Sequence, residues 1–272
     1  MSIDPGAISE WRSAIGRQET RCEVLAVESL RRYALAIGRD ADVERSQPAL
    51  AHWAFFLPAP ADDEVGGDGH PKRGGFLPAI TLPRRMFAAS RMEFHVPLEL
   101  GKLAEMTSIV ADVVHKSGRS GDLVFVEVER VLRQDGVPRV SERQSYVYRG
   151  DGESTAMPAP SADPIDGETW HPDEINLFRF SAATFNGHRI HYDLPYASEV
   201  EGYPALVIHG PFTASKLAEL ASRERPLASF SFRAQAPLFL GQAVTLQRAQ
   251  NELRALRADG AVAMTGAATW VE

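Results

Sequence analysis

The sequence has very little cysteine: Cys22 is the single one among 272 residues. One thiol cannot close an internal disulfide, which excludes a disulfide-stabilised fold and indicates a reducing compartment. No histidine lies near Cys22 in the sequence, and a buried structural cysteine is commoner than a reactive one. A cysteine nucleophile is therefore not expected.

Long apolar runs are also missing. No stretch approaches the roughly 20 apolar residues that a membrane-spanning helix requires. The N-terminal residues MSIDPGAISEW contain an early acid and a proline, and lack the apolar core of a signal peptide. These absences predict a cytoplasmic protein with no membrane partner.

A net positive charge is absent as well, because 29 lysines and arginines face 36 acidic residues and leave a formal charge of -7. The phosphates of nucleic acid would on average be repelled, so no nucleic-acid partner is expected. Hydrophobic residues make up 44% and charged residues 24%, a balance typical of a globular chain with a substantial core. The length suits one large domain or two ordinary ones.

The sequence does contain an internal repeat. Four short segments of the first half recur in the same order in the second half: 48–50 with 204–206, 97–101 with 237–241, 132–136 with 256–260, and 145–147 with 269–271. The distance in sequence between matching segments decreases along the chain because the first half has two extra stretches. These are the Gly/Pro/Asp-rich loop 58–75 and a stretch between residues 101 and 132. We predict a tandem duplication, residues 1–150 and 151–272, with its boundary in the Gly/Ser/Pro/Asp-rich stretch 150–167.

Each copy is expected to begin as helix and to continue as strands. Residues 214–221 are strong helix formers with an apolar face that includes Leu217, Leu220 and Ala221. Residues 230–235 alternate as a strand does. Asp135-Gly136 and Asp259-Gly260 are the strongest hairpin signals in the chain. The pattern predicts an α+β fold in which one apolar helix packs on a mostly antiparallel sheet.

The stretch FNGHRIHYD, residues 185–193, gathers an amide, two histidines and an aspartate. By residue type alone it is a catalytic loop, a metal site or a polar turn. His188 and His191 are three residues apart, and His209 or Asp193 could complete three ligands, although the spacing is not that of a known zinc signature. Asn186 is equally a helix cap or a turn former.

Two segments of the second half resemble a known family. FSAATFNGHRIHYD from residue 180 and PALVIHGPFTASKLAEL from residue 204 are similar to the MaoC-like (R)-specific enoyl-CoA hydratases. More narrowly they resemble the two-domain hydroxyacyl-thioester dehydratase type 2 group, as does GGFLPAITLPRRMFAASRMEF from residue 74. The resemblance implies a tandem, or double, hot-dog fold in which a curled antiparallel sheet surrounds a central helix in each copy. It also implies a metal-free hydro-lyase, with no cofactor beyond the coenzyme A of its substrate.

The motif of these hydratases places an aspartate five residues before a histidine. His191 matches the histidine, but Asn186 occupies the aspartate position, and an amide cannot titrate. We expect His191 to act as the base and Asn186 to hold the attacking water. Gly210 is expected to stabilise the enolate through its N–H at the start of the central helix.

Further residues of the same region are predicted to contact the substrate. His188 lines the pocket or lies in a solvated turn, and Arg189 stands in a motif position that carries proline in the family. His209 orients the start of the helix. Asp193 replaces the missing acid, pairs with Arg189 or orients an imidazole.

In the first copy, Arg84 and Arg85 are the predicted substrate-binding residues. Arginine binds carboxylate and phosphate bidentately, so the pair could hold the free carboxylate of a dicarboxylic acyl group or the phosphates of coenzyme A. Two solvated arginines at a strand edge are the alternative. The counterpart of His191 is missing from this copy, and His52-Trp53 stands where His209-Gly210 falls. One active site is therefore expected, in the second copy and closed over by the first.

The predicted reaction is the reversible hydration of a 2-enoyl-CoA to a 3-hydroxyacyl-CoA. A short dicarboxylic substrate such as mesaconyl-C4-CoA or itaconyl-CoA is favoured by the resemblance. The alternatives are a 3-hydroxyacyl-ACP dehydratase, a non-catalytic protein that binds acyl-thioesters, and a hot-dog thioesterase. Because a tandem chain already contains the pair that single hot dogs assemble, monomer and homodimer both stay open.

Overall fold

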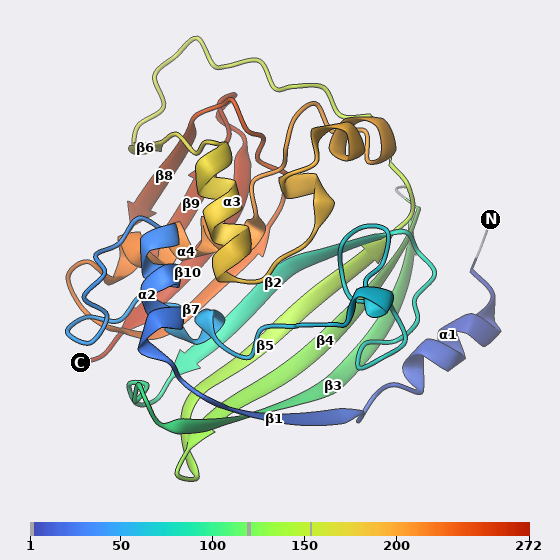
Figure 1. Cartoon of the computed structure of the whole chain (residues 1–272). Coiled ribbons are helices and arrows are strands. Elements are labelled where there is room, and N and C mark those ends of the chain that lie inside the picture. The colour runs from blue at the N-terminus through green and yellow to red at the C-terminus, as the bar shows by residue number, and fades with distance from the viewer. Residues whose placement is uncertain (1–2, 119–120, 153) are drawn as a thin grey trace.

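The computed structural model describes residues 3–118, 121–152 and 154–272. Its strands form one antiparallel sheet in the order β1-β3-β4-β5-β2-β7-β10-β9-β8-β6 (Figure 1). The first copy contributes β1 (Gln18–Val24), β2 (Arg84–Phe94), β3 (Leu103–Gly118), β4 (Gly121–Gln134) and β5 (Val137–Arg149). The second contributes β6 (Glu168–Trp170), β7 (Leu227–Ala234), β8 (Val244–Ala249), β9 (Glu252–Leu256) and β10 (Val262–Trp270).

The two halves of this sheet have the same strand order. When the strands of each copy are numbered in chain order, both halves of the sheet have the order first, third, fourth, fifth, second from the outer edge to the middle. The two second strands, β2 and β7, pair with each other in the middle. This identity confirms the internal repeat. The boundary near residue 150 stays a prediction, since the sheet is continuous across the two copies.

Both predicted hairpins are present. Asp135 and Gly136 join β4 to β5 with φ values of 49° and 76°, the left-handed pair that a tight two-residue turn requires. Asp259 and Gly260 lie in a longer connection between β9 and β10, where Gly260 alone of the two has a positive φ.

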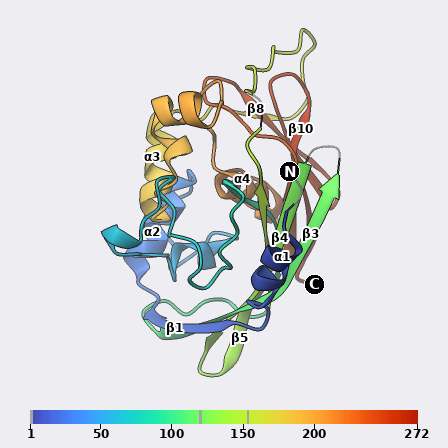
Figure 2. The same cartoon turned by 90° about the vertical axis from the view of Figure 1, so that its right-hand side faces the viewer.

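The predicted central helix of the second copy is α4 (Gly210–Ser222). Its side chains Leu217, Ala218 and Ala221 are fully buried, and the helix contacts β7, β8, β9 and β10. Figure 2 shows α4 between the sheet and the outer helices α2 (Val27–Ala36) and α3 (Glu174–Ala183). Tyr33 of α2 and Ser215 of α4 share a hydrogen bond of 2.8 Å, which links the two copies inside one core.

The first copy departs from the expectation of a central helix in each copy. At the matching place the structure has only a single 3-10 turn, η1 (Ala51–Ala54). Phe55 is extended, Phe56 takes a positive φ of 54°, and prolines follow at 58 and 60. Proline lacks an N–H and keeps the preceding residue out of the helical region, so the helix cannot continue. Loop 58–75 follows instead, with a short 3-10 turn η2 (Asp62–Glu64).

The remaining helical elements are short. α1 (Pro5–Arg12) packs on β3, with Trp11 buried in a second, smaller core. The 3-10 turn η3 (Arg189–His191) and the π-helical turn η4 (Tyr196–Val200) follow α3 and lead towards α4. None of the described helices is long and apolar enough to cross a membrane.

Candidate active site

The stretch 185–193 forms a tight turn and a 3-10 turn directly after α3. The Asn186 side-chain oxygen accepts the His188 N–H at 3.0 Å, and the Asn186 N–H donates to the Ser181 carbonyl at 2.8 Å. Asn186 is therefore a turn former, one of the alternatives weighed for it. It also lines the space beside His191, so the turn places the amide next to the imidazole.

Two cavities meet at this turn. One has a volume of about 460 Å³ and is lined by both copies, including His188, His191 and Gly210 from the second and Arg85 from β2. The other, of about 690 Å³, occupies the region of η1 and is mostly apolar. The two share four lining residues, His70, Phe87, Asn186 and Pro211. A long ligand can therefore run through both, past the imidazole of His191.

His191 is 7% exposed and has a defined tautomer. Its Nδ1 lies 2.7 Å from the Val207 carbonyl oxygen, which can only accept, so Nδ1 carries the hydrogen. The Nε2 lone pair is left for a ligand. Burial lowers the pKa of His191 to about 4, against the opposing effect of the Val207 hydrogen bond. The ring is thus neutral near pH 7 and able to accept a proton.

Four imidazoles stand in a row through the site. Ring centroids lie 4.1 Å apart for His70 and His188, 5.3 Å for His188 and His191, and 3.6 Å for His191 and His209. Burial is the main cause of a lowered pKa at His188 and at His209. Within the part of the chain that the structure describes, no three histidine, cysteine or acidic side chains form a metal-ligand group.

Gly210 lies at the first turn of α4, as the sequence predicted, and lines the smaller cavity. Its N–H has no acceptor among the described residues. Outside its own helix and chain neighbours, a Cβ at this position would meet only the Phe87 carbonyl oxygen, at 3.8 Å. An unpaired N–H together with the positive end of the helix dipole favours a negatively charged oxygen here.

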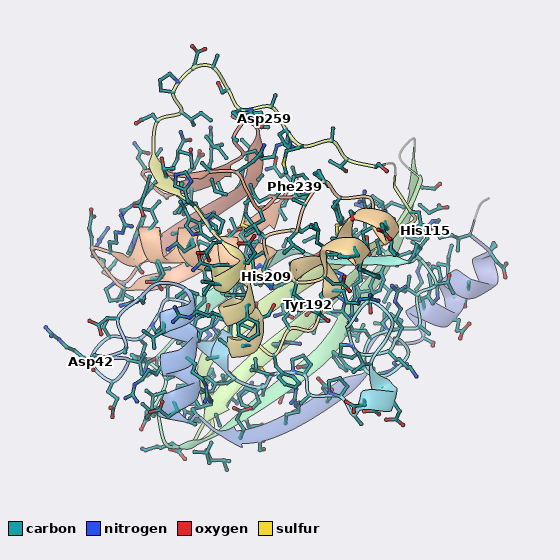
Figure 3. All side chains as sticks on the ribbon, turned by 45° about the horizontal axis from the view of Figure 1, so that its top comes forward. Asp42, His115, Tyr192, His209, Phe239 and Asp259 are labelled. Carbon is teal, nitrogen blue, oxygen red and sulfur yellow. The ribbon has the colours of Figure 1, made fainter. Side chains whose placement is uncertain are left out.

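His209 is not among the lining residues of either cavity, and its role as a substrate-binding residue stays a prediction. The side chain is fully buried, precedes α4 and has its Nε2 2.8 Å from the Ser181 hydroxyl. Figure 3 shows it in the interior beside α3. Its ring stacks on His191, so it supports the orientation of the helix start and of the neighbouring imidazole.

Arg189 and Asp193 are also absent from the linings of both cavities, and substrate contact by them stays a prediction. They pair with each other, since Nη2 of Arg189 lies 2.7 Å from Oδ2 of Asp193. This pairing is one of the three roles considered for Asp193, and it argues against the role of replacement acid. Arg189 also donates to the Gly67 carbonyl at 3.0 Å, which ties this turn to loop 58–75.

Replacing Asp193 by asparagine is accordingly expected to leave enoyl-thioester hydration nearly intact. Asparagine keeps an oxygen for the Tyr196 N–H, which donates to Asp193 at 3.1 Å, while the Arg189 pair weakens. Steady-state kinetics should show a change well short of the about 10²–10⁴-fold loss that follows removal of a proton-transfer group. A loss of that size with an unchanged melting temperature would restore Asp193 as the acid.

The two arginines of β2 differ in their partners. Arg84 is 7% exposed and is held by Glu201, through a 3.3 Å ion pair and a 2.8 Å hydrogen bond to its backbone oxygen. Its charge is therefore compensated inside the protein, which argues against Arg84 as an anion-binding residue. Arg85 lines the same cavity, and no described carboxylate forms an ion pair with it. Arg85, like Arg149 of β5 in the same cavity, is therefore placed to bind an anionic group.

Two residues of this site lay outside the sequence prediction. Asp68 and His70 belong to loop 58–75, which the repeat comparison identified only as an insertion, and both line the smaller cavity. Their hydrogen bond, 3.2 Å from His70 Nδ1 to Asp68 Oδ2, joins residues two positions apart. The GDGH sequence itself gives no sign that the loop contacts a turn far along the chain in the second copy.

Comparisons with known proteins agree with this architecture. The family model described as hydroxyacyl-thioester dehydratase type 2 matches residues 50–240. Mesaconyl-C(4)-CoA hydratase of Chloroflexus aurantiacus is 48% identical over 202 residues, which cover 71% of each chain.

Solved structures show the same fold at low sequence identity. A MaoC-like dehydratase from Phytophthora capsici superposes with a TM-score of 0.69 at 15% identity, covering 97% of this chain and 98% of its own. A Mycobacterium tuberculosis protein described as having a double hotdog fold gives a TM-score of 0.52 at 14% identity, covering 93% and 95%. The double hot-dog fold predicted from the sequence is confirmed.

Proposed function

The chain belongs to the hydroxyacyl-thioester dehydratase type 2 family, and we propose that it reversibly adds water to a 2-enoyl-CoA to give a 3-hydroxyacyl-CoA. One observation carries the proposal: a neutral imidazole with a free Nε2 lines the same cavity as the unpaired N–H of a helix start. This is the pair of groups that hydration of a thioester needs.

The reaction builds negative charge on the thioester oxygen when water attacks the β-carbon. Gly210 donates its N–H to this oxygen, and the start of α4 stabilises the enolate. His191 accepts a hydrogen bond from the attacking water through Nε2 and activates it. The Asn186 amide, fixed by its bond to the His188 N–H, helps to orient the water.

The substrate class we favour is a short dicarboxylic enoyl-CoA such as mesaconyl-C4-CoA. The relative with 48% identity is named for that substrate, and Arg85 brings to the cavity of His191 a guanidinium that forms no ion pair with a described carboxylate. Itaconyl-CoA presents the same two chemical features, an enoyl or isomeric alkenyl thioester and a free carboxylate. Acyl groups on a carrier protein are the alternative and would place no carboxylate at Arg85.

Replacing Arg85 by alanine tests this choice. The KM for mesaconyl-C4-CoA is expected to rise about tenfold to 100-fold, because a hydrogen bond to a charged partner contributes about 1.5–3 kcal/mol. The KM for crotonyl-CoA, which has no second carboxylate, should change little. Arg91→Ala, at an exposed position of the same strand, is the matched control. Equal effects of Arg85→Ala on both substrates would assign Arg85 to coenzyme A instead.

The activity itself is tested by following the loss of enoyl absorbance with crotonyl-, mesaconyl- and itaconyl-CoA and with an acyl-carrier-protein substrate. Free thiol measured in the same samples separates hydration from thioester hydrolysis. Binding of acyl-CoA without turnover would support the non-catalytic alternative and refute the hydratase.

Two further expectations accompany this proposal. A cytoplasmic location and either a monomer or a homodimer were predicted from the sequence, and both stay predictions. No nucleic-acid or membrane partner enters the proposed reaction, and coenzyme A takes part only as the carrier of the acyl group.

A further inference from the structure

Loop 58–75 of the first copy brings an aspartate–histidine pair to the cavity of the second copy. Asp68 Oδ2 lies 3.2 Å from His70 Nδ1, and Asp68 Oδ1 accepts the His70 backbone N–H at 3.0 Å. The carboxylate fixes the hydrogen on Nδ1 and leaves Nε2 as an acceptor, for which the described residues offer no partner. Both side chains line the cavity that also contains His191 and Gly210.

The backbone of this loop packs closely against the turn that carries Asn186 and His191. A Cβ on Gly69 would lie 1.8 Å from the Gly187 oxygen, and one on Gly187 would lie 2.7 Å from the Gly69 oxygen. The Arg189 backbone N–H donates to the Asp68 backbone carbonyl oxygen at 2.9 Å. Beside this contact, the His70 ring packs on the His188 ring with 4.1 Å between the two ring centroids. The pair is thus a fixed part of the site.

His70 is the one imidazole of the row with a carboxylate on its ring. His191 donates to a neutral carbonyl and His209 meets a serine hydroxyl, while His188 has no side-chain partner in the described residues. A buried imidazolium is strongly disfavoured unless an anion lies beside it. Burial lowers the pKa of His70 too, and the nearby Arg85 and Arg73 add to this, but Asp68 opposes them. A proton taken up in this cavity is therefore best tolerated on His70.

We propose that His70, positioned by Asp68, carries the proton that leaves the water and returns to the substrate, in place of the acid missing at Asn186. The inference rests on the hydratase function proposed above. His191 keeps its part, which is to hold and activate the water, and His70 receives the charge. Asp68 is a positioning residue that stabilises the imidazolium.

The proton balance closes within one turnover. The water O–H bond breaks, its proton moves to His70 Nε2, the oxygen bonds to the β-carbon, and the C=C electron pair moves onto the thioester oxygen. The enolate held at Gly210 then reforms its carbonyl, and the α-carbon takes the proton back from His70 Nε2. The enzyme returns to neutral His70 and ionised Asp68, and the product has gained one water.

The test compares His70→Ala, His70→Gln and Asp68→Asn with the wild type, using crotonyl- and mesaconyl-C4-CoA. We expect kcat of His70→Ala to fall about 10²–10⁴-fold with little change in KM. The kcat of Asp68→Asn should fall roughly 10–100-fold, as when a carboxylate that orients a functional histidine is lost. His70→Gln keeps a side chain that can donate to Asp68, so its low kcat with a normal melting temperature would exclude misfolding.

Rescue by added imidazoles distinguishes a proton-transfer role of His70 from a purely structural role. They should restore turnover of His70→Ala, and the restored rate should rise with the pKa of the added imidazole. His188→Ala, which removes the neighbouring ring without a carboxylate partner, is the matched control and should show no such dependence.

The outcomes separate the two proposals. A wild type inert on every enoyl-thioester would refute the hydratase, and the role of His70 with it. An active wild type whose kcat survives His70→Ala within a few-fold would refute the role of His70 alone. Loss of kcat without rescue in a folded protein would show that His70 only supports the loop, and would refute it as well.

Discussion

Alanine at position 191 is expected to lower kcat for enoyl-CoA hydration about 10²–10⁴-fold while KM changes little. The physical reason is the geometry of the ring: Nδ1 of His191 is committed to the Val207 carbonyl at 2.7 Å, and Nε2 is the atom available to the water. With a pKa of about 4, the imidazole is already unprotonated at neutral pH. Stopped-flow or steady-state loss of enoyl absorbance measures the effect.

Two variants control this result. His191→Gln keeps an amide that can donate to Val207 and so separates lost chemistry from lost structure; it should be nearly as slow as the alanine variant. His95→Ala removes an exposed histidine whose ring lies 2.8 Å from the Ser141 hydroxyl and which lines neither cavity, and it should retain wild-type kcat. Wild-type turnover by both His191 variants would remove this histidine from the mechanism.

Alanine at position 69 is expected to have the second large effect, about 10²-fold on kcat, because small displacements of catalytic groups cost that much. A methyl group there would lie 1.8 Å from the Gly187 oxygen, and Gly69 has a φ of 85° that a side chain rarely tolerates. The loop cannot stay docked on the turn of Asn186 and His191. Asp68 and His70 would then leave the cavity.

Gly67→Ala is the matched control for this loop. Nothing lies within 4 Å of a Cβ at Gly67, its φ is not positive, and its carbonyl can still accept from Arg189. The two alanine variants should therefore differ sharply in kcat, measured by steady-state kinetics, and little in global stability, measured by thermal melts. Full activity of Gly69→Ala would show that docking of the loop is dispensable for the reaction.

Much of the fold could be predicted from local pattern and repetition. The apolar face of residues 214–221 predicted α4, and the Asp-Gly pairs predicted the two hairpins, because these signals act between neighbours in the chain. The family resemblance implied a central helix in the first copy as well, whereas Pro58 and Pro60 are residues that end a helix. Chain-breaking residues decided the structure there.

The candidate site was predictable in its motif residues and in Arg85, but not in the residues that loop 58–75 adds. The motif spacing singled out Asn186, His191 and Gly210, and all three line the same cavity. Sequence spacing could not show that His209 is sealed behind His191, since burial depends on how α3 packs over α4. Sequence spacing also could not show that Glu201 compensates the charge on Arg84, because the two residues are 117 positions apart.

The hairpins, the central helix and the hydratase motif could be located in the sequence because each depends on residues close together in the chain, and the duplication could be located because its segments recur in the same order. Tertiary structure alone decided which charges face the cavity. Arg189 reaches the Gly67 carbonyl across 122 positions, and that contact seats Asp68 and His70 beside the motif. No local propensity encodes such a contact, since it forms only when the two copies pack around one sheet.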